Sequence, residues 1–194
     1  MSRLAAFFLA FLFIWQPAQA MPAPHMVTPD NVGVGFSIRY MLVAKASGRF
    51  NDITGSYSFD PEADELGAID VTIGTGSVDT GSPGRDRDLA GEDFFWTDRY
   101  PTMHFISRHA VRTGPHAGRV EGDLTLRGVT RPVVLMVALG DHMATATTSV
   151  KRSEFGMRPG LAGLVIADKV DIRIEIRDLP GGTAPATGAP PPPA

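Results

Sequence analysis

Histidine is the side chain in this sequence best suited to metal binding or proton transfer, because its imidazole coordinates metals and titrates near neutral pH. His104 and His109 fall in one predicted strand, where their odd spacing places them on opposite faces. His116 lies in a Gly-Pro-His-Ala-Gly turn and His142 in another turn. The sequence has no cysteine and no HxH pair, so we expect no metal site.

Nucleophilic and phosphate-binding motifs give no stronger candidate. Ser153 lies outside any GxSxG motif and has no activating base close to it in the sequence. The run GTGSVDTG over 74–81 carries glycines but lacks the lysine and the strand–loop–helix context of a phosphate loop, so we interpret it as a turn. These observations favour a binding protein over an enzyme, and we expect no cofactor.

Composition excludes several partners and linkages. Without cysteine the chain cannot form disulfides, so burial of a core must hold the domain together. The formal net charge is −3, with both signs mixed along the chain, which gives no reason to expect nucleic acid as a partner.

The two ends of the chain differ in composition from its body. Residues 1–20 combine a positive start, an apolar stretch and the small-residue ending Ala-Gln-Ala, which is the pattern of a cleaved secretory signal peptide. That apolar stretch is shorter than the roughly 20 residues of a membrane-spanning helix, so we expect no stable membrane span. One domain is expected over 21–180, followed by a flexible tail rich in Pro, Gly and Ala over 181–194.

Alternation of apolar and polar residues dominates the body of the chain. In the final strand, for example, Val170, Ile172 and Ile174 alternate with charged residues, which indicates a sheet with one wet and one dry face. One helix is predicted over 85–95. Eight strands are predicted, at 33–40, 49–59, 68–75, 103–112, 118–127, 132–140, 143–152 and 168–178.

Eight antiparallel strands suit a closed barrel, because closure removes the exposed edges of an open sheet. We therefore predict an all-β, eight-stranded antiparallel, lipocalin-like barrel with a short helix capping one end. The segment 133–139 is apolar on both faces, so we expect a helix, a loop or the second subunit of a homodimer to cover its outer face. An outer-membrane barrel is disfavoured, because it needs aromatic girdles and the chain has only three Tyr and two Trp.

Three stretches of the sequence resemble the YceI-like family: VDTGSPGRDRDLAGEDFFWTDRYPTMHFIS at 78–107, GDLTLRGVTRPV at 122–133 and KRSEFGM at 151–157. The resemblance extends from about Val27 to Asp178. It implies a periplasmic barrel that holds a polyisoprenoid or another long-chain or amphiphilic lipid in a tunnel-like cavity. The family generally has histidine near Asp30 or Asn31 and at Tyr40 and Asp88, so any family role of those histidines does not carry over.

The residues expected to contact such a ligand are mostly the inward-facing apolar side chains of the predicted strands and the aromatic side of the predicted helix. A filled core without a cavity is the alternative for these same positions. The expected ligand-binding residues are Phe36, Ile38, Tyr40, Phe50, Tyr57, Val71, Ile73, Phe94, Phe95, Phe105, Leu124, Leu126, Leu135, Arg152 and Phe155.

Arginines at predicted turns and strand ends could pair a pyrophosphate or another polar head group with two parallel hydrogen bonds. Arg152 is the best of these candidates. The alternative is that local ion pairs, Arg85–Asp86 and Arg152–Glu154, only fix the corners of the barrel. The candidate arginines are Arg85, Arg87, Arg152 and Arg158.

Three hypotheses on function follow from the sequence. The first is a periplasmic lipid carrier or store. The second is an enzyme acting on a lipid in the same cavity, for which the expected lining offers only Tyr40, Tyr57 and His109 as titratable groups. The third is a solid-core protein-interaction module that uses its tail and the outer face of strand 132–140. The family resemblance favours the carrier.

Overall fold

The structure is a computed structural model that describes residues 23–41, 44–60, 65–158, 160 and 165–179. The predicted signal peptide and the predicted tail lie outside these residues. Among the described residues, no helix has the length and apolarity needed to cross a membrane.

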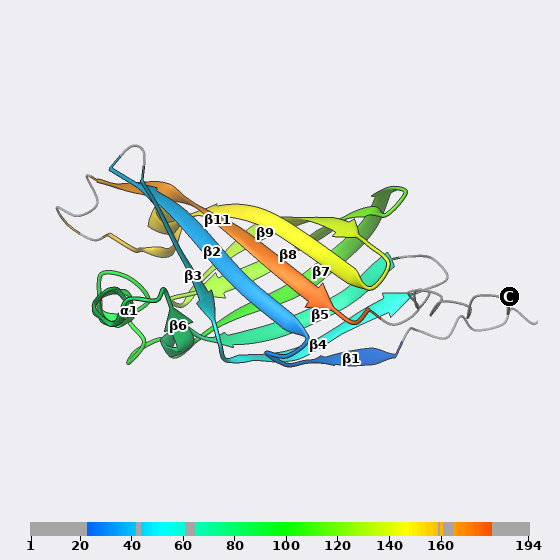
Figure 1. Cartoon of the computed structure of the whole chain (residues 1–194), viewed down its shortest axis with the longest axis horizontal. Helices are drawn as coiled ribbons and strands as arrows, with labels where there is room; N and C mark the ends of the chain where they lie inside the picture. Colours follow the sequence, from blue (N-terminus) through cyan, green and yellow to red (C-terminus); the bar gives the residue numbers. More distant parts are fainter. Residues whose placement is uncertain (1–22, 42–43, 61–64, 159, 161–164, 180–194) are drawn as a thin grey trace, which may run out of the picture.

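The described residues form one antiparallel sheet of eleven strands, which curls along its length into a half-barrel (Figure 1). Across the sheet, the hydrogen-bonded strands follow one another in the order β1-β4-β5-β7-β8-β9-β10-β11-β2-β3-β6. The strands are β1 (Pro24–Val27), β2 (Val32–Tyr40), β3 (Ala44–Phe50), β4 (Ile53–Asp60), β5 (Glu65–Gly74), β6 (Val78–Asp79), β7 (Thr102–Gly114), β8 (Ala117–Leu126), β9 (Val129–Leu139), β10 (Met143–Lys151) and β11 (Ile166–Arg177).

The all-β, antiparallel character predicted from the sequence is confirmed, but the closed eight-stranded barrel is wrong. The sheet has two edges, β1 and β6, and no ladder joins them within the described part of the chain. The predicted strand 49–59 is in fact the end of β3 and most of β4, separated at Asn51 and Asp52. Asp52 accepts a backbone hydrogen bond from Gly74, and this corner sends β3 to pair with β2 while β4 pairs with β5.

A short helix, α1 (Pro83–Ala90), lies at one end of the half-barrel, beside β6 (Figure 1). A helix there was predicted, but over 85–95. The helix begins earlier because Pro83 suits the first turn, where its missing N–H is not needed. It ends at Gly91, whose backbone is extended, and the following residues form turns in which the Phe95 amide donates to the Leu89 carbonyl.

Strand β7 contains an irregularity that reverses one prediction. Ser107 pairs with Gly122 and His109 with Glu121, so the register shifts between them. Ala110 then faces buried Val120 across the ladder, and His109 points to the outer face. His104 also faces outward, where its Nε2 lies 2.7 Å from an Asp70 carboxylate oxygen. The prediction that the two histidines occupy opposite faces is therefore wrong, because the bulge adds one residue between them.

Strand β9 alternates regularly between buried and exposed residues. Val133, Leu135, Val137 and Leu139 point into the core. Val134 and Met136 face outward with exposed fractions of 40% and 53%. No helix or loop among the described residues covers this outer stripe, so that part of the prediction is wrong, while a second subunit remains a prediction.

Candidate ligand cavity

The inside of the half-barrel holds a cavity of about 1180 Å³. This volume exceeds the roughly 300–1,000 Å³ typical of small-molecule pockets. The inward residues of β2 line it at every second position from Val32 to Tyr40. A strand rises about 3.3 Å per residue, so these nine residues span roughly 26 Å. The cavity is therefore long enough for an extended chain-like ligand.

All fifteen residues predicted from the sequence to contact a ligand lie on the wall of this cavity. Contact with a ligand remains a prediction for each of them. Sequence reasoning missed further wall residues on several elements, β1, β2, α1, β7, β9 and β11 among them. Their alternation was visible in the sequence for β9 and β11, but β1 carries only four residues and gave no signal. Among the missed residues are Val27, Val34, Leu89, Met103, Val137 and Ile172.

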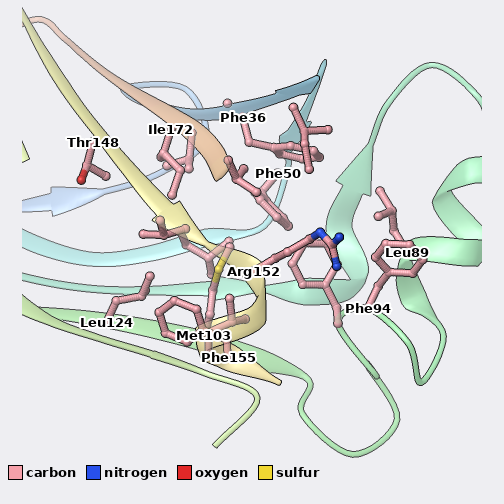
Figure 2. Close-up of a pocket in the computed structure, with 18 of the residues that line it drawn as sticks. Phe36, Phe50, Leu89, Phe94, Met103, Leu124, Thr148, Arg152, Phe155 and Ile172 are labelled. Atoms are coloured by element: carbon pink, nitrogen blue, oxygen red, sulfur yellow. The ribbon is translucent and has the colours of Figure 1, made fainter. Parts of the chain in front are cut away.

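Aromatic rings form a row near the α1 end of the cavity. The Phe36 and Phe50 rings lie 5.6 Å apart between centroids, and Phe50 lies 5.6 Å from Phe95 in an edge-to-face arrangement. Figure 2 shows Phe36 and Phe50 projecting from neighbouring strands, with Ile172 beside them and Leu89 and Phe94 on the α1 side. Offset and edge-to-face contacts of this kind fix ring orientation and give the cavity a rigid apolar wall.

Charged side chains line the cavity at the α1 end, where Arg85, Arg87, Asp88, Glu92 and Asp93 contribute to its wall. The predicted ion pair of Arg85 with Asp86 does not form as expected. Both side chains bind Thr80 instead: Arg85 donates to its hydroxyl and carbonyl, and Asp86 accepts from its amide at 2.9 Å. This arrangement ties the start of α1 to β6.

Arg152 lines the cavity but has a structural task that the sequence did not reveal. It is 9% exposed and begins a short 3-10 helix, Arg152–Phe155, after β10. Its guanidinium donates through Nε, Nη1 and Nη2 to the carbonyls of Ala167 (3.1 Å), Met157 (3.2 Å) and Ile166 (3.0 Å). Its guanidinium is thus not free, and pairing with a head group remains a prediction, whereas the alternative pair with Glu154 is wrong. Glu154 lies 3.7 Å from Lys151 instead.

Ser153 next to it holds Asp168 at the start of β11. The Ser153 amide and hydroxyl donate to the two carboxylate oxygens at 2.9 and 2.7 Å. Burial opposes ionisation of Asp168, but these two hydrogen bonds and the nearby Arg152 charge outweigh it and lower the pKa of the carboxyl group. Ser153 thus serves as a donor that closes this corner.

Two tyrosines, Tyr40 and Tyr57, line the cavity. Tyr57 is 3% exposed, and burial followed by the negative charge of Asp178 raises the pKa of its phenol. The hydroxyl therefore stays neutral at physiological pH. His109, the third titratable group expected in the lining, lies outside the cavity because of the bulge in β7.

Arg127 anchors the loop after α1, and nothing in the sequence pointed to this role. Its Nη1 donates to the carbonyls of Glu92, at 2.8 Å, and of Phe94. Its guanidinium also lies 5.8 Å from the centroid of the Trp96 ring, which Arg99 approaches to 4.8 Å. Arg127 therefore holds the loop that carries Phe94 and Phe95 against the β8–β9 turn. Within the described residues, no group of three or more His, Asp or Glu is arranged to hold a metal ion.

Fold and cavity together define a class: small all-β proteins in which a curled antiparallel sheet surrounds a long apolar cavity, with a short helix at one end. Within this class, the chain belongs to the YceI-like family, whose domain profile matches residues 26–177. The family resemblance seen in the sequence is thereby confirmed. A UPF0312 protein of Pseudomonas savastanoi pv. phaseolicola is 31% identical over 155 residues, which cover 73% of this chain and 81% of the relative.

Solved structures with a similar fold include Burkholderia cenocepacia BcnA, with a TM-score of 0.67 and 26% identity over 77% of this chain and 98% of that one. Another is a Saccharophagus degradans domain described as polyisoprenoid-binding and implicated in plant cell wall breakdown. It has a TM-score of 0.59 and 18% identity over 81% of this chain and 99% of that one. At this identity the second likeness shows the fold alone.

Proposed function

We propose that this protein binds one long-chain lipid, a polyisoprenoid or a similar aliphatic chain, and carries or stores it in the periplasm. The observation that carries the proposal is the cavity of about 1180 Å³, lined along the whole of β2 by apolar side chains. The polyisoprenoid-binding description of the Saccharophagus degradans domain, which shares the fold, supports the same class of ligand.

Burial of apolar surface supplies the binding free energy in this proposal. At roughly 25 cal/mol per Å² of surface removed from water, each isoprene unit contributes a few kcal/mol. Ordering of the flexible chain and loss of its free motion offset part of this gain. The polar end of the ligand would lie at the α1 end, where Arg85, Arg87 and Asp88 are among the charged residues on the wall.

Binding without turnover is the form of the proposal that the lining favours. The wall is mostly aliphatic and aromatic, and burial raises the pKa of Tyr57 further above the physiological range, which disfavours the phenolate that a base would need. A solid-core interaction module agrees less well with the structure, because a cavity of this size is not a filled core. The secretory signal predicted in the sequence supports the periplasmic assignment.

Native mass spectrometry of the protein purified from a periplasmic extract tests the proposal, followed by extraction and analysis of the released lipid. We expect one prenyl or long acyl species per chain. Two neighbouring threonines of β10 provide a matched pair of variants: Thr148 lines the cavity, whereas Thr147 is exposed on the outer face. Thr148→Trp should lose the ligand and Thr147→Trp should retain it. A wild-type protein that stays free of lipid after incubation with isoprenoid quinones would refute the proposal.

A further inference from the structure

The width of the cavity near α1 depends on a glycine that faces a phenylalanine. Phe36 on β2 pairs directly with Gly48 on β3. A Cβ atom placed on Gly48 would lie 2.7 Å from Cζ and 2.8 Å from Cε1 of the Phe36 ring. Apolar carbon atoms in contact are normally about 3.5–4.0 Å apart. The Phe36 ring therefore occupies the space that any other residue at position 48 would fill with its own side chain.

A second cavity-lining ring, that of Phe105 on β7, lies against a glycine as Phe36 does, in this case Gly122 on β8. The Cζ and Cε2 atoms of Phe105 would be 2.5 and 2.7 Å from a Cβ atom on Gly122. That position also lies 2.5 Å from the Ile106 carbonyl oxygen, so backbone would clash there as well. Gly48 differs, because its three nearest atoms all belong to side chains, those of Phe36 and of Thr80. Of these two positions, Gly48 is the one where side chains and not the backbone must give way.

The surroundings of Phe36 decide where its ring would move. Ile172 faces it across the β2–β11 ladder, and the Phe50 ring lies 5.6 Å away (Figure 2). The Thr80 Cγ2 atom lies 2.8 Å from the same Cβ position on Gly48, and its hydroxyl is held by Arg85 and Asp86, so the threonine methyl group must shift as well. The cavity is the open side of the ring. A methyl group at position 48 would therefore push Phe36 into the cavity and narrow it.

We propose that Gly48 is a specificity-determining residue that keeps the cavity wide enough for a methyl-branched chain. This inference rests on the proposed lipid-binding function. It goes further by assigning the width of the binding site to one pair of residues. A slender unbranched chain needs less width and would still pass a displaced Phe36 ring.

The test compares geranylgeraniol with hexadecanol, two alcohols with main chains of equal length, of which only the first carries methyl branches. Delipidated wild-type protein and Gly48→Ala are titrated with each alcohol by native mass spectrometry. We expect Gly48→Ala to weaken geranylgeraniol binding about tenfold or more, since a misfit of one methyl group in an apolar pocket has effects of that order. Hexadecanol binding should change less than about threefold, because its chain lacks the branches that meet the ring.

Three further variants make the result specific. Gly76→Ala is the control, because a Cβ there meets nothing within 4 Å and Gly76 does not line the cavity. Phe36→Leu combined with Gly48→Ala should restore geranylgeraniol binding by removing the displaced ring. Phe36→Trp, with Gly48 retained, places a larger ring in the cavity and should weaken binding of geranylgeraniol more than binding of hexadecanol, as Gly48→Ala does. This variant keeps the test valid if Gly48→Ala folds poorly.

The outcomes separate this inference from the proposed function. A wild-type protein that binds neither alcohol refutes lipid binding itself. A wild-type protein that binds both, while Gly48→Ala and Phe36→Trp affect the two alcohols equally or not at all, overturns the role of Gly48 and leaves lipid binding intact. Selective loss of geranylgeraniol, reversed by Phe36→Leu, establishes it.

Discussion

Arg152 is a cavity residue that joins two segments of the chain through its guanidinium. Its three hydrogen bonds to carbonyl oxygens join the 3-10 helix after β10 to the start of β11. Arg152→Met keeps most of the aliphatic volume but leaves these carbonyls without their donor. We expect the free energy of unfolding to fall by about 2–4 kcal/mol, measured by urea denaturation.

The neighbouring Lys151 is the control for this prediction. Its amine is exposed and lies 3.7 Å from Glu154, so Lys151→Met should change stability by less than about 0.5 kcal/mol. If Arg152→Met were as stable as the control and instead lost only ligand, Arg152 would be a head-group receptor, as first expected from the sequence.

Asp168 gives a prediction on pH. The pKa of Asp168 in the folded protein lies below the ordinary value of 3.8. Burial alone would raise this pKa, but the two hydrogen bonds from Ser153 outweigh burial and lower it. A carboxyl group with a lowered folded pKa adds stability above its unfolded pKa, and that stability is lost as the pH falls through the folded value. Asp168→Asn should therefore be less stable than wild type at neutral pH.

The difference between Asp168→Asn and wild type should shrink steadily below pH 3.8, which urea midpoints recorded across the acid range would detect. Exposed Asp98→Asn is the comparison and should track the wild-type curve throughout. A gap between Asp168→Asn and wild type that stays constant with pH would mean that the hydrogen bonds, and not the charge, stabilise this corner.

Single residues also show what could be foreseen from the sequence. The inward positions of β2, β5 and β8 followed from period-two alternation, because side chains on a strand point to opposite faces in turn. The partners of Arg152 and Arg127 could not be foreseen, since both bind backbone carbonyls of distant segments. Every residue has a backbone carbonyl, so the sequence does not show which one is bound.

Among the elements, the loop between α1 and β7 depends most on one anchor. Arg127 donates to two of its carbonyls and lies over Trp96. We expect Arg127→Met to speed amide hydrogen exchange across residues 91–100 while β8 and β9 keep their protection, because the loop has few other ties to the sheet.

The exposed Arg131 on β9 provides the matched control, and Arg131→Met should leave exchange in 91–100 unchanged. The loss of global stability should be modest, because the Arg127 Nε is buried without a partner and its removal relieves that cost. Equal exchange in wild type and Arg127→Met would show that aromatic packing alone holds the loop.

Elements were predicted unevenly, for physical reasons. β11 was clear because its apolar and charged residues alternate over the full length of the strand. β3 was largely missed because its inward side chains are Ala44, Ala46 and Gly48, which are too small to produce a hydrophobic pattern. At Gly48 the absence of a side chain leaves room for the Phe36 ring, so at this position the weak hydrophobic signal and the width of the cavity have the same origin.

At the scale of the whole molecule, the sequence predicted a sheet with a dry interior but could not decide between a filled core and a cavity. The same side chains fit either, and the difference lies in how the sheet curls and where rings such as Phe36 and Phe105 lie against glycine. The count of strands was wrong because β1 and β6 are short and β3 carries small residues, and closure, inferred from that count, was wrong because β1 and β6 end the sheet at separate edges.

Those two edges have a mechanical consequence. Widening a closed barrel requires breaking backbone hydrogen bonds along a full ladder, and each bond contributes about 0.5–1.5 kcal/mol. Here no ladder within the described chain spans the gap between the β1–β4 edge and the β3–β6 edge. The two edges are joined at the corner where β3 passes into β4: the Asn51 amide donates to the Ser77 carbonyl and the Gly74 amide to the Asp52 carbonyl. Away from this corner, the two edges can separate without the loss of any ladder hydrogen bond among the described residues.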